Sequence, residues 1–136
     1  SFLDNGYTTE EMKMQNEGRK ILHHPSLKVS CTCVRVPVVR SHSISIDLVT
    51  KDCLDINMVK EVISNEKGCR LYDNPKENLY PMPIVTSNQD LVYVGRIRKC
   101  LIHENGISLW CSGDQVRKGA ATNAVQIMMK LIGLEI

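Results

Sequence analysis

Four side chains in the first third of the chain have types and spacings suited to chemistry on a small charged molecule. Glu10 and Lys13 stand three residues apart, so on a helix they share one face and offer an anion beside a cation. Arg35 is a guanidinium in an apolar run, where burial is costly unless a carboxylate or similar group pairs with it. His42 follows seven residues later, and a histidine can act as a general acid or base near neutral pH.

Each of these residues also has an ordinary structural interpretation, which spacing alone leaves open. Glu10 and Lys13 could form a solvated surface ion pair, which stabilises a helix by only about 0.2–0.5 kcal/mol. Arg35 could be an exposed arginine on an edge strand, and His42 could be a structural histidine with satisfied hydrogen bonds. An odd spacing along an unbroken strand would place Arg35 and His42 on opposite faces, but the intervening Pro37 can change that parity.

The element that positions the first pair is predicted by its capping signal. Thr8 and Glu11 have the spacing of a capping box, in which the threonine and glutamate side chains bond each other's backbone N–H groups. This predicts a helix from about Thr9 to Leu22, ending before Pro25. Because Glu11 is then occupied by the cap, the neighbouring glutamate is free to bind a ligand.

The next segments favour two strands and a second helix. Residues 29–36 are rich in β-branched residues and cysteine, which favours a strand. Pro37 has no N–H to donate, so the hydrogen-bond ladder of such a strand must end or form a β-bulge there. Residues 43–48 alternate strictly between polar and apolar, which predicts a strand with one buried face. Residues 55–65 have apolar residues at helical spacing, which predicts a helix with one apolar stripe. The stripe consists of Ile56, Val59 and Ile63.

The remaining chain predicts a hairpin followed by a long helix. Strands over 91–97 and 107–111 are separated by Asn105-Gly106, a strong signal for a two-residue turn. Asp114 can cap a last helix, from about Gln115 to Leu131, that is apolar over a broad face. Hairpin-connected strands with helices on one face predict an α+β fold. The sheet is small, so we expect something to cover its edges, such as a second copy of the chain.

Length, composition and charge narrow the class of protein. The chain has 136 residues, of which 43% are hydrophobic and 24% charged, as in one globular domain rather than a disordered chain. The net charge is +2 and only 4% of residues are aromatic, so we expect no nucleic-acid partner. No apolar run of about 18 residues and no signal peptide is visible, so we expect no membrane span and a cytoplasmic location. The chain has no starting Met, so we expect it to begin inside a longer protein or after processing.

Six cysteines raise the question of disulfides or a metal. They lie at positions 31, 33, 53, 69, 100 and 111, and no two of them form a C-x-x-C pair. The adjacent His23 and His24 do not complete the four paired ligands of a zinc site, so we expect no metal. Free thiols in a reducing compartment are therefore favoured over a disulfide framework.

Three segments of the chain resemble the C-terminal half of aspartate-semialdehyde dehydrogenases. They are residues 7–15, residues 33–43 (Cys-Val-Arg-Val-Pro-Val-Val-Arg-Ser-His-Ser) and residues 106–124, which include Ser-Gly-Asp-Gln-Val-Arg-Lys-Gly-Ala-Ala. The resemblance covers nearly the whole chain, and its specific part is the spacing of Glu10, Lys13, Arg35 and His42. It implies a mainly antiparallel or mixed sheet with helices on one face, similar to the C-terminal domain of glyceraldehyde-3-phosphate dehydrogenase.

The resemblance also implies a reaction. The family uses NADPH to reduce L-aspartyl 4-phosphate to L-aspartate 4-semialdehyde with release of phosphate, on the route to lysine, methionine, threonine and isoleucine. A cysteine attacks the acyl phosphate, hydride reduces the thioester, and a hemithioacetal collapses to the aldehyde. By position, His42 corresponds to the family's acid-base histidine, and Arg35 to the arginine that binds the substrate carboxylate. Glu10 corresponds to the glutamate that binds the substrate amino group, and Lys13 to the lysine that contacts phosphate. Gln115 corresponds to a residue near the nicotinamide.

The chain departs from the family pattern in two ways. The family begins with a Gly-rich dinucleotide-binding domain and carries its nucleophile in a Ser-x-Cys-Thr-Thr type motif, and both are absent here. We therefore expect residues 1–136 to be the substrate-binding and dimerisation portion, inactive alone and forming a homodimer. NADP would be bound mainly by the missing N-terminal domain. The alternative is a non-enzymatic oligomerisation domain that keeps the fold and has lost the chemistry, and a nucleic-acid-binding module is a weaker third option.

Overall fold

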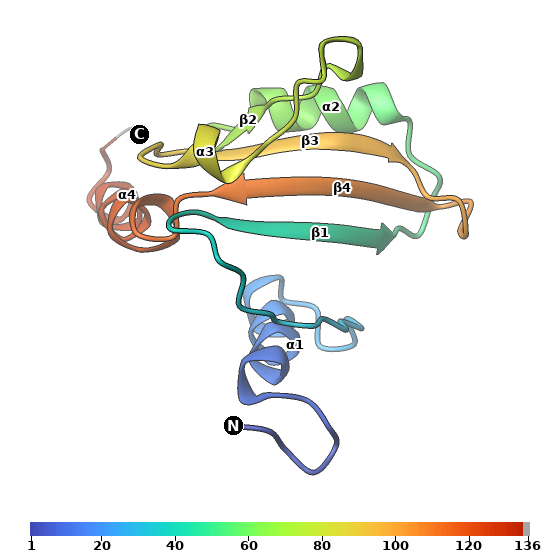
Figure 1. Ribbon diagram of the computed structural model, residues 1–136, viewed down its shortest axis with the longest axis vertical. Coiled ribbons are helices and arrows are strands. Elements are labelled where there is room, and N and C mark those ends of the chain that lie inside the picture. The colour runs from blue at the N-terminus through green and yellow to red at the C-terminus, as the bar shows by residue number, and fades with distance from the viewer. Residues whose placement is uncertain (135–136) are drawn as a thin grey trace. The chain divides into compact units, whose positions relative to one another are not determined.

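The chain divides into two units in the computed structural model, which describes residues 1–134 (Figure 1). The first unit spans Ser1–Pro37, and the second begins at Val38. Within residues 1–134, no helix combines the length and apolar character needed to cross a membrane.

The first unit is built on helix α1, Thr9–Ile21, which confirms the predicted helix. Thr8 Oγ1 accepts the backbone N–H of Glu11 at 3.2 Å, and Glu11 Oε2 accepts the backbone N–H of Thr8 at 2.7 Å. The capping box therefore forms as expected and starts the helix at the predicted residue.

The predicted strand over residues 29–36 is wrong. The segment has no strand structure and runs instead along α1, where Cys33 N–H donates to Glu11 Oε1 at 2.8 Å. The Tyr7 hydroxyl lies 3.3 Å from Ser30 Oγ, which adds a second link between the segment and the residues before α1. A strand needs a neighbouring backbone to pair with, and within this unit the segment meets side chains of α1 rather than another strand.

The second unit contains a four-stranded mixed sheet, which confirms the α+β fold class. The strands are β1 (His42–Val49), β2 (Cys69–Leu71), β3 (Val92–Lys99) and β4 (Gly106–Gly113). They lie in the order β1-β4-β3-β2, with β1 and β3 antiparallel to β4 and with β2 parallel to β3. The short β2 was not predicted, because three residues carry too little periodicity to identify a strand.

Helix α2, Ile56–Asn65, covers one face of the sheet (Figure 1). Asp55 Oδ1 accepts the backbone N–H of Asn57 and Met58 and so caps the helix at its start. The predicted stripe of Ile56, Val59 and Ile63 packs against the core, as expected. The buried residues at the centre of that core are Val94, Ile97, Ile107 and Cys111.

The opposite face of the sheet carries the one-turn helix α3, Pro83–Thr86. Successive residues of a strand alternate between faces, so Trp110 and Ser112 point away from the side that Cys111 occupies. Trp110 Nε1 donates to the carbonyl of Pro81 at 3.0 Å, and Ser112 Oγ lies 2.9 Å from Thr86 Oγ1. These bonds fasten the end of β4 to the segment around α3.

The predicted two-residue turn at Asn105-Gly106 is wrong. The connection between β3 and β4 spans residues 100–105, and Gly106 is already the first residue of β4, opposite Val49. The expected turn type needs positive φ at both central residues, and neither Asn105 nor Gly106 has it. Gly106 is needed for space, because a Cβ there would lie 2.5 Å from Cys100 Cβ.

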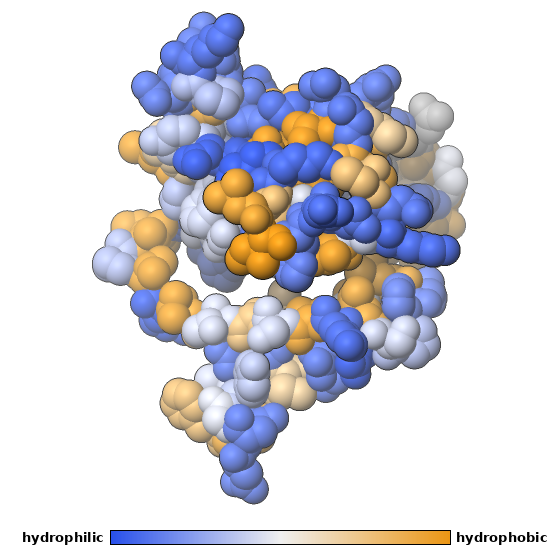
Figure 2. Space-filling model, turned by 90° about the vertical axis from the view of Figure 1, so that its right-hand side faces the viewer, coloured by the Kyte–Doolittle hydropathy of each residue, from blue (hydrophilic) through white to orange (hydrophobic). Residues whose placement is uncertain are grey.

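The last predicted helix is present with an irregular first part. A π-helical turn, η2, spans Arg117–Ala121 and passes directly into α4, Thr122–Leu131. Asp114 caps this element as predicted, because its Oδ1 accepts the backbone N–H of Val116 at 2.9 Å and of Arg117 at 3.0 Å. Its apolar residues are exposed within the unit, among them Val125, Met128 and Leu131. Hydrophobic residues also reach the surface elsewhere, as Figure 2 shows.

Candidate functional site

The five predicted site residues fall into the two units. Glu10, Lys13 and Arg35 belong to the first unit, and His42 and Gln115 belong to the second. Each group has its own geometry, which follows from the elements that carry it.

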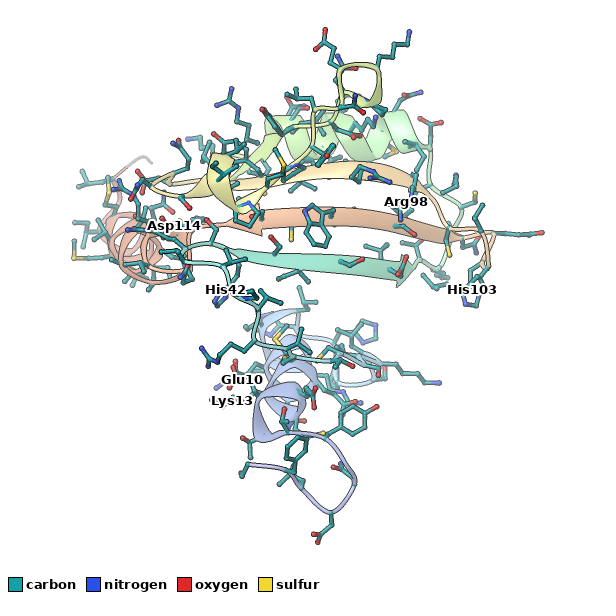
Figure 3. All side chains as sticks on the ribbon, in the orientation of Figure 1. Glu10, Lys13, His42, Arg98, His103 and Asp114 are labelled. Atoms are coloured by element: carbon teal, nitrogen blue, oxygen red, sulfur yellow. The ribbon has the colours of Figure 1, made fainter. Side chains whose placement is uncertain are left out.

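Glu10 and Lys13 form a contact pair near the N-terminal end of α1 (Figure 3). Lys13 Nζ lies 3.3 Å from Glu10 Oε2, and the lysine and glutamate side chains are 59% and 65% exposed. The capping box engages Glu11 and leaves Glu10 for this pair, as predicted. An exposed pair of this kind is held by only about 0–1 kcal/mol, so a charged ligand can separate the two groups at little cost.

Arg35 is exposed and lies in the irregular segment that follows α1. It is therefore neither the buried arginine nor the edge-strand arginine that the sequence suggested. Within residues 1–134 it makes no salt bridge, so its guanidinium is available to a carboxylate from outside the chain.

His42 is the first residue of β1 and lies opposite Gly113 at the end of β4. Its backbone carbonyl accepts a hydrogen bond from Ser112 Oγ at 3.2 Å. The residue is exposed, and its imidazole has no hydrogen-bond partner among residues 1–134. The structure therefore argues against a histidine satisfied by its own fold and leaves both ring nitrogens accessible.

Arg40, two residues before His42, binds a buried carboxylate that the sequence identified only as a helix cap. Asp114 accepts hydrogen bonds from Arg40 Nε at 2.6 Å and from the Asn88 backbone N–H at 2.7 Å, besides its two capping bonds. Burial alone would raise the pKa of this carboxyl, but the Arg40 guanidinium and the backbone donors outweigh it and hold the pKa well below its usual range. Asp114 is therefore ionised at any ordinary pH.

Gln115 is bonded to the segment directly before His42. Its Oε1 accepts the backbone N–H of Ser41 at 2.6 Å, one residue before His42. Sequence reasoning missed Ser41, because its neighbours in space come from residues 86–87 and 115 and no local pattern marks it.

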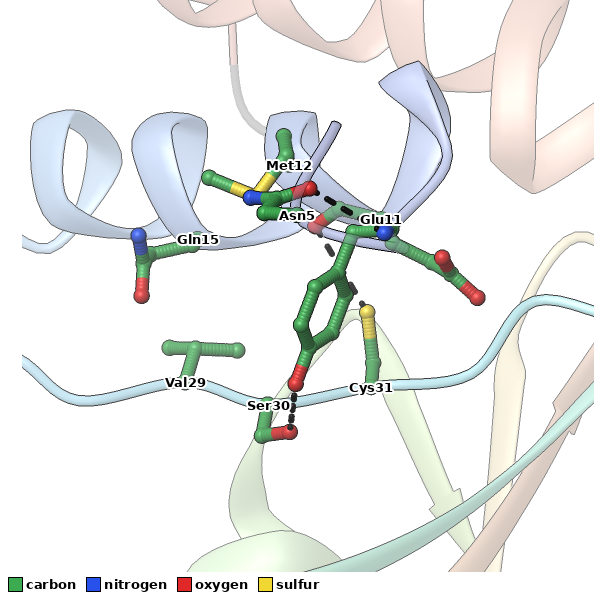
Figure 4. Close-up of a pocket in the computed structure, with 8 residues that line it drawn as sticks. Asn5, Glu11, Met12, Gln15, Val29, Ser30 and Cys31 are labelled. Atoms are coloured by element: carbon green, nitrogen blue, oxygen red, sulfur yellow. Dashed lines mark hydrogen bonds between the residues drawn. The ribbon is translucent and has the colours of Figure 1, made fainter. Parts of the chain in front are cut away.

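A small hollow in the first unit does not contain the predicted site residues. It has a volume of about 200 Å³ and lies between α1 and the extended segment (Figure 4). Its lining consists of Asn5, Tyr7, Glu11, Met12, Gln15, Val29, Ser30 and Cys31. Burial, followed by the neighbouring Cys33, raises the pKa of the Cys31 thiol, which disfavours the nucleophilic thiolate. The hollow is smaller than the roughly 300–1,000 Å³ of typical ligand pockets.

An apolar groove of about 260 Å³ lies beside α2 in the second unit. Its lining is entirely apolar and includes Leu48, at the far end of β1 from His42, together with Met58 and Val62 of α2. The groove therefore offers a packing surface and no polar group that could orient a substrate.

Three of the four cysteines of the second unit, Cys69, Cys100 and Cys111, are poorly placed to serve as a nucleophile beside His42. Burial raises the pKa of the Cys69 and Cys111 thiols. Backbone N–H groups of Ile102 and His103 lower the pKa of Cys100, but this residue lies at the hairpin end of β4. At roughly 3.3 Å per residue along an eight-residue strand, that end lies roughly 20 Å from the end paired with His42.

The described part of the chain does not meet the requirements of a metal site. Within residues 1–134, no group of three or more His, Cys, Asp or Glu side chains is arranged to hold a metal ion.

The sequence and the fold match one family. The family model described as "Semialdehyde dehydrogenase, dimerisation domain" matches residues 1–118, and the chain belongs to that family. Within it, the chain corresponds to the C-terminal, dimerisation portion of aspartate-semialdehyde dehydrogenases, as the resemblance predicted.

Individual relatives support this assignment. The chain is 50% identical to an aspartate-semialdehyde dehydrogenase of Aquifex aeolicus over 131 residues, covering 96% of this chain and 38% of that protein. It is 48% identical to the Campylobacter jejuni protein over 134 residues, covering 98% of this chain and 39% of the relative. The chain thus spans about two-fifths of the length of the curated relatives it matches.

Solved structures agree in fold. Aspartate semialdehyde dehydrogenase II from Vibrio cholerae superposes with a TM-score of 0.92 at 42% identity, covering 97% of this chain and 39% of that one. A second structure of the Vibrio cholerae protein, described as complexed with ASA, gives a TM-score of 0.91 at 42% identity, with the same shares of the two chains covered.

Proposed function

We propose that residues 1–136 form the substrate-binding and dimerisation portion of an NADPH-dependent aspartate-semialdehyde dehydrogenase. The whole enzyme would reduce L-aspartyl 4-phosphate to L-aspartate 4-semialdehyde in amino-acid biosynthesis and would act in the cytoplasm as a homodimer. The observation that carries this proposal is the family match together with the retained set of Glu10, Lys13, Arg35 and His42. This portion alone would be inactive, since it lacks the nucleophile motif.

The charged residues fit a zwitterionic acyl phosphate. Such a substrate needs an anion for its amino group, a planar cation for its carboxylate and a second cation for its phosphate. Glu10, Arg35 and Lys13 would supply these three groups. The Glu10–Lys13 pair is exposed and weakly held, so each member can turn to its own part of the substrate.

His42 would hold and move the proton. The thioester route needs a donor and acceptor that work near neutral pH, and an accessible imidazole on a fixed strand end meets that need. The chain's own residues would therefore bind the substrate, orient it and exchange a proton with it, while the attacking thiolate would come from the part of the enzyme outside this chain.

NADP would contact this chain at Gln115, the one cofactor-binding residue that the resemblance implies. The sequence has no G-x-G-x-x-G turn with which to hold the diphosphate of a dinucleotide. Gln115 would lie near the nicotinamide, where the cofactor supplies the hydride. The rest of the cofactor would be held mainly by the N-terminal domain of the whole enzyme.

A chimeric enzyme tests the proposal. The matching segment of the Aquifex aeolicus enzyme is replaced by residues 1–136, and phosphate-dependent NADPH formation from aspartate semialdehyde is measured. We expect turnover from the chimera and none from residues 1–136 alone. A folded chimera without turnover would favour the non-enzymatic oligomerisation domain, and turnover by the isolated chain above its His42→Ala variant would overturn the fragment interpretation.

A further inference from the structure

The carboxylate of Asp114 joins three segments that lie far apart in the sequence. Its Oδ2 accepts hydrogen bonds from Arg40 Nε at 2.6 Å and from the Asn88 backbone N–H at 2.7 Å. Its Oδ1 accepts from the backbone N–H groups of Val116 and Arg117, at 2.9 and 3.0 Å. The carboxylate is fully buried, so every one of these bonds is sheltered from water.

The neighbouring Gln115 completes this junction. Its Oε1 accepts the Ser41 backbone N–H at 2.6 Å, and the Ser41 hydroxyl lies 3.0 Å from Thr86 Oγ1 and 3.2 Å from Ser87 Oγ. Ser41 has a backbone φ of +76°, in the left-handed region that is uncommon for residues other than glycine. The hydrogen bonds around Ser41 therefore hold a conformation that it would seldom adopt unaided.

We propose that Asp114 and Gln115 are positioning residues for His42, acting through the Arg40–Ser41 turn. Asp114 holds the Arg40 side chain and Gln115 holds the Ser41 backbone, directly before His42. On the other side, Ser112 Oγ holds the His42 carbonyl. The backbone of His42 is thus fixed from both directions while its ring stays accessible (Figure 3).

Such positioning matters because proton transfer depends steeply on geometry. A displacement of about 1 Å at a reacting group can reduce the rate about 100-fold. This inference rests on the proposed role of His42, but the hydrogen bonds that carry it can be tested without any catalytic activity.

The same bond limits what Gln115 can offer to a cofactor. A side-chain amide has one oxygen that accepts and one NH₂ group that donates. Because the oxygen already accepts from Ser41, the NH₂ group is the part of the side chain that remains for a new donor contact to a ligand. At the nicotinamide, Gln115 would therefore act as a donor through this NH₂ group.

The first test measures amide hydrogen exchange by NMR in the isolated chain. Gln115→Leu removes the acceptor, and we expect exchange at Ser41 to accelerate about tenfold, as for loss of one hydrogen bond. Gln115→Glu keeps an oxygen acceptor and should retain the protection. Asp90→Asn is the matched control, because Asp90 bonds Arg117 and Thr122 side chains and does not contact the Arg40–Ser41 turn.

The second test measures kinetics of the same variants in the chimeric enzyme. Gln115→Leu should lower kcat with little change in KM for aspartate semialdehyde, because His42 is displaced while the substrate contacts remain. Gln115→Glu should restore kcat but raise KM for NADP, since its carboxylate cannot donate to the nicotinamide. Asp114→Asn, which sets an NH₂ group against two of the four donors, should lower kcat more than Asp90→Asn does.

Two results would overturn the proposal. One is unchanged exchange at Ser41 in Gln115→Leu. The other is accelerated exchange with a kcat loss equal to that of Asp90→Asn, which would show general destabilisation instead of positioning. If the chimera carrying the unmodified segment is inactive, the proposed function fails on that result alone, while the exchange measurements still decide whether the Ser41 bond exists.

Discussion

At the scale of single residues, accessibility distinguishes the candidate site from the rest of the polar network. Glu10, Lys13, Arg35 and His42 are exposed, whereas the carboxylates that hold the fold together, Glu11 and Asp114, are buried and fully bonded. A buried carboxylate with several donors stabilises structure, and an exposed charge with few partners can bind a ligand. The predictions at this scale follow from that division.

Arg35→Lys in the chimeric enzyme keeps the charge and loses the planar group that grips a carboxylate through two hydrogen bonds. We expect kcat/KM for aspartate semialdehyde to fall about 30- to 1,000-fold with little change in the affinity for NADPH. Arg98→Lys is the matched control, because Arg98 Nη1 donates to the carbonyl of Arg96 in β3 and has no proposed ligand. Kinetics of Arg35→Lys equal to those of the control would refute the carboxylate assignment.

His42→Asn removes proton transfer and keeps a polar side chain of similar reach. Turnover of the chimera should fall about 100-fold or more, with little change in substrate affinity. His103→Asn, in the connection between β3 and β4, should leave turnover near that of the unmodified chimera. Weakened substrate binding with normal turnover would instead mean that the roles of Arg35 and His42 must be exchanged.

Asp90 makes stability depend on pH. Hydrogen bonds from Arg117 and then Thr122 lower the pKa of its carboxyl from 3.8 to about 2. Because the folded pKa is depressed, the stabilisation is present above 3.8 and is lost as the pH falls through about 2. We expect the difference in denaturant midpoint between the unmodified chain and Asp90→Asn to shrink over that interval. A difference that is constant with pH would show that the ion pair contributes nothing to folding.

At the scale of elements, the sheet depends on a close approach at its centre. Gly95 lies in β3 just before the bulge in its pairing with β4, and a Cβ there would overlap the Tyr72 carbonyl oxygen and lie 2.7 Å from Pro81 Cδ. The first of these contacts is with backbone, which cannot move aside without disturbing the link between β2 and β3.

Gly95→Ala should therefore destabilise the second unit by about 1–3 kcal/mol, the usual cost of overpacking. Gly119→Ala is the control, since a Cβ there meets its neighbours at 3.5 Å or more, which is ordinary contact. Denaturation followed by Trp110 fluorescence measures both variants. Equal stabilities would mean that the backbone around Gly95 yields easily.

At the scale of the whole molecule, apolar surface is left without a partner among residues 1–134. Ile44 and Val49 of β1 are 47% and 62% exposed, although they belong to an otherwise regular strand. The family is described as a dimerisation domain, and a sheet with exposed apolar residues commonly meets a second copy.

We expect a dimer or larger species in sedimentation experiments on residues 1–136. Ile44→Glu places a charge on β1 and should weaken association, whereas Leu101→Glu changes a fully exposed residue between β3 and β4 and should leave it intact. A monomer that persists at high micromolar concentration would contradict the expectation.

The parts of the protein that the sequence by itself determined are those set by interactions within a few residues. The capping box of α1 and the apolar stripe on α2 involve partners no more than about two turns apart, so spacing alone predicted them. The resemblance then identified the family and proposed its site residues, because the residue types of a motif and their spacing can be read from the sequence without knowing any tertiary contact.

Only the tertiary structure decided the features that depend on distant partners. Residues 29–36 have strand-forming side chains, yet they lie along α1 because no strand is beside them in their unit. The turn predicted at Asn105-Gly106 was displaced because the pairing of β1 with β4 places Gly106 inside the strand. The bonds of Asp114 to Arg40 and of Gln115 to Ser41 each span 74 residues, and no local signal can predict an interaction that exists only once the chain has folded.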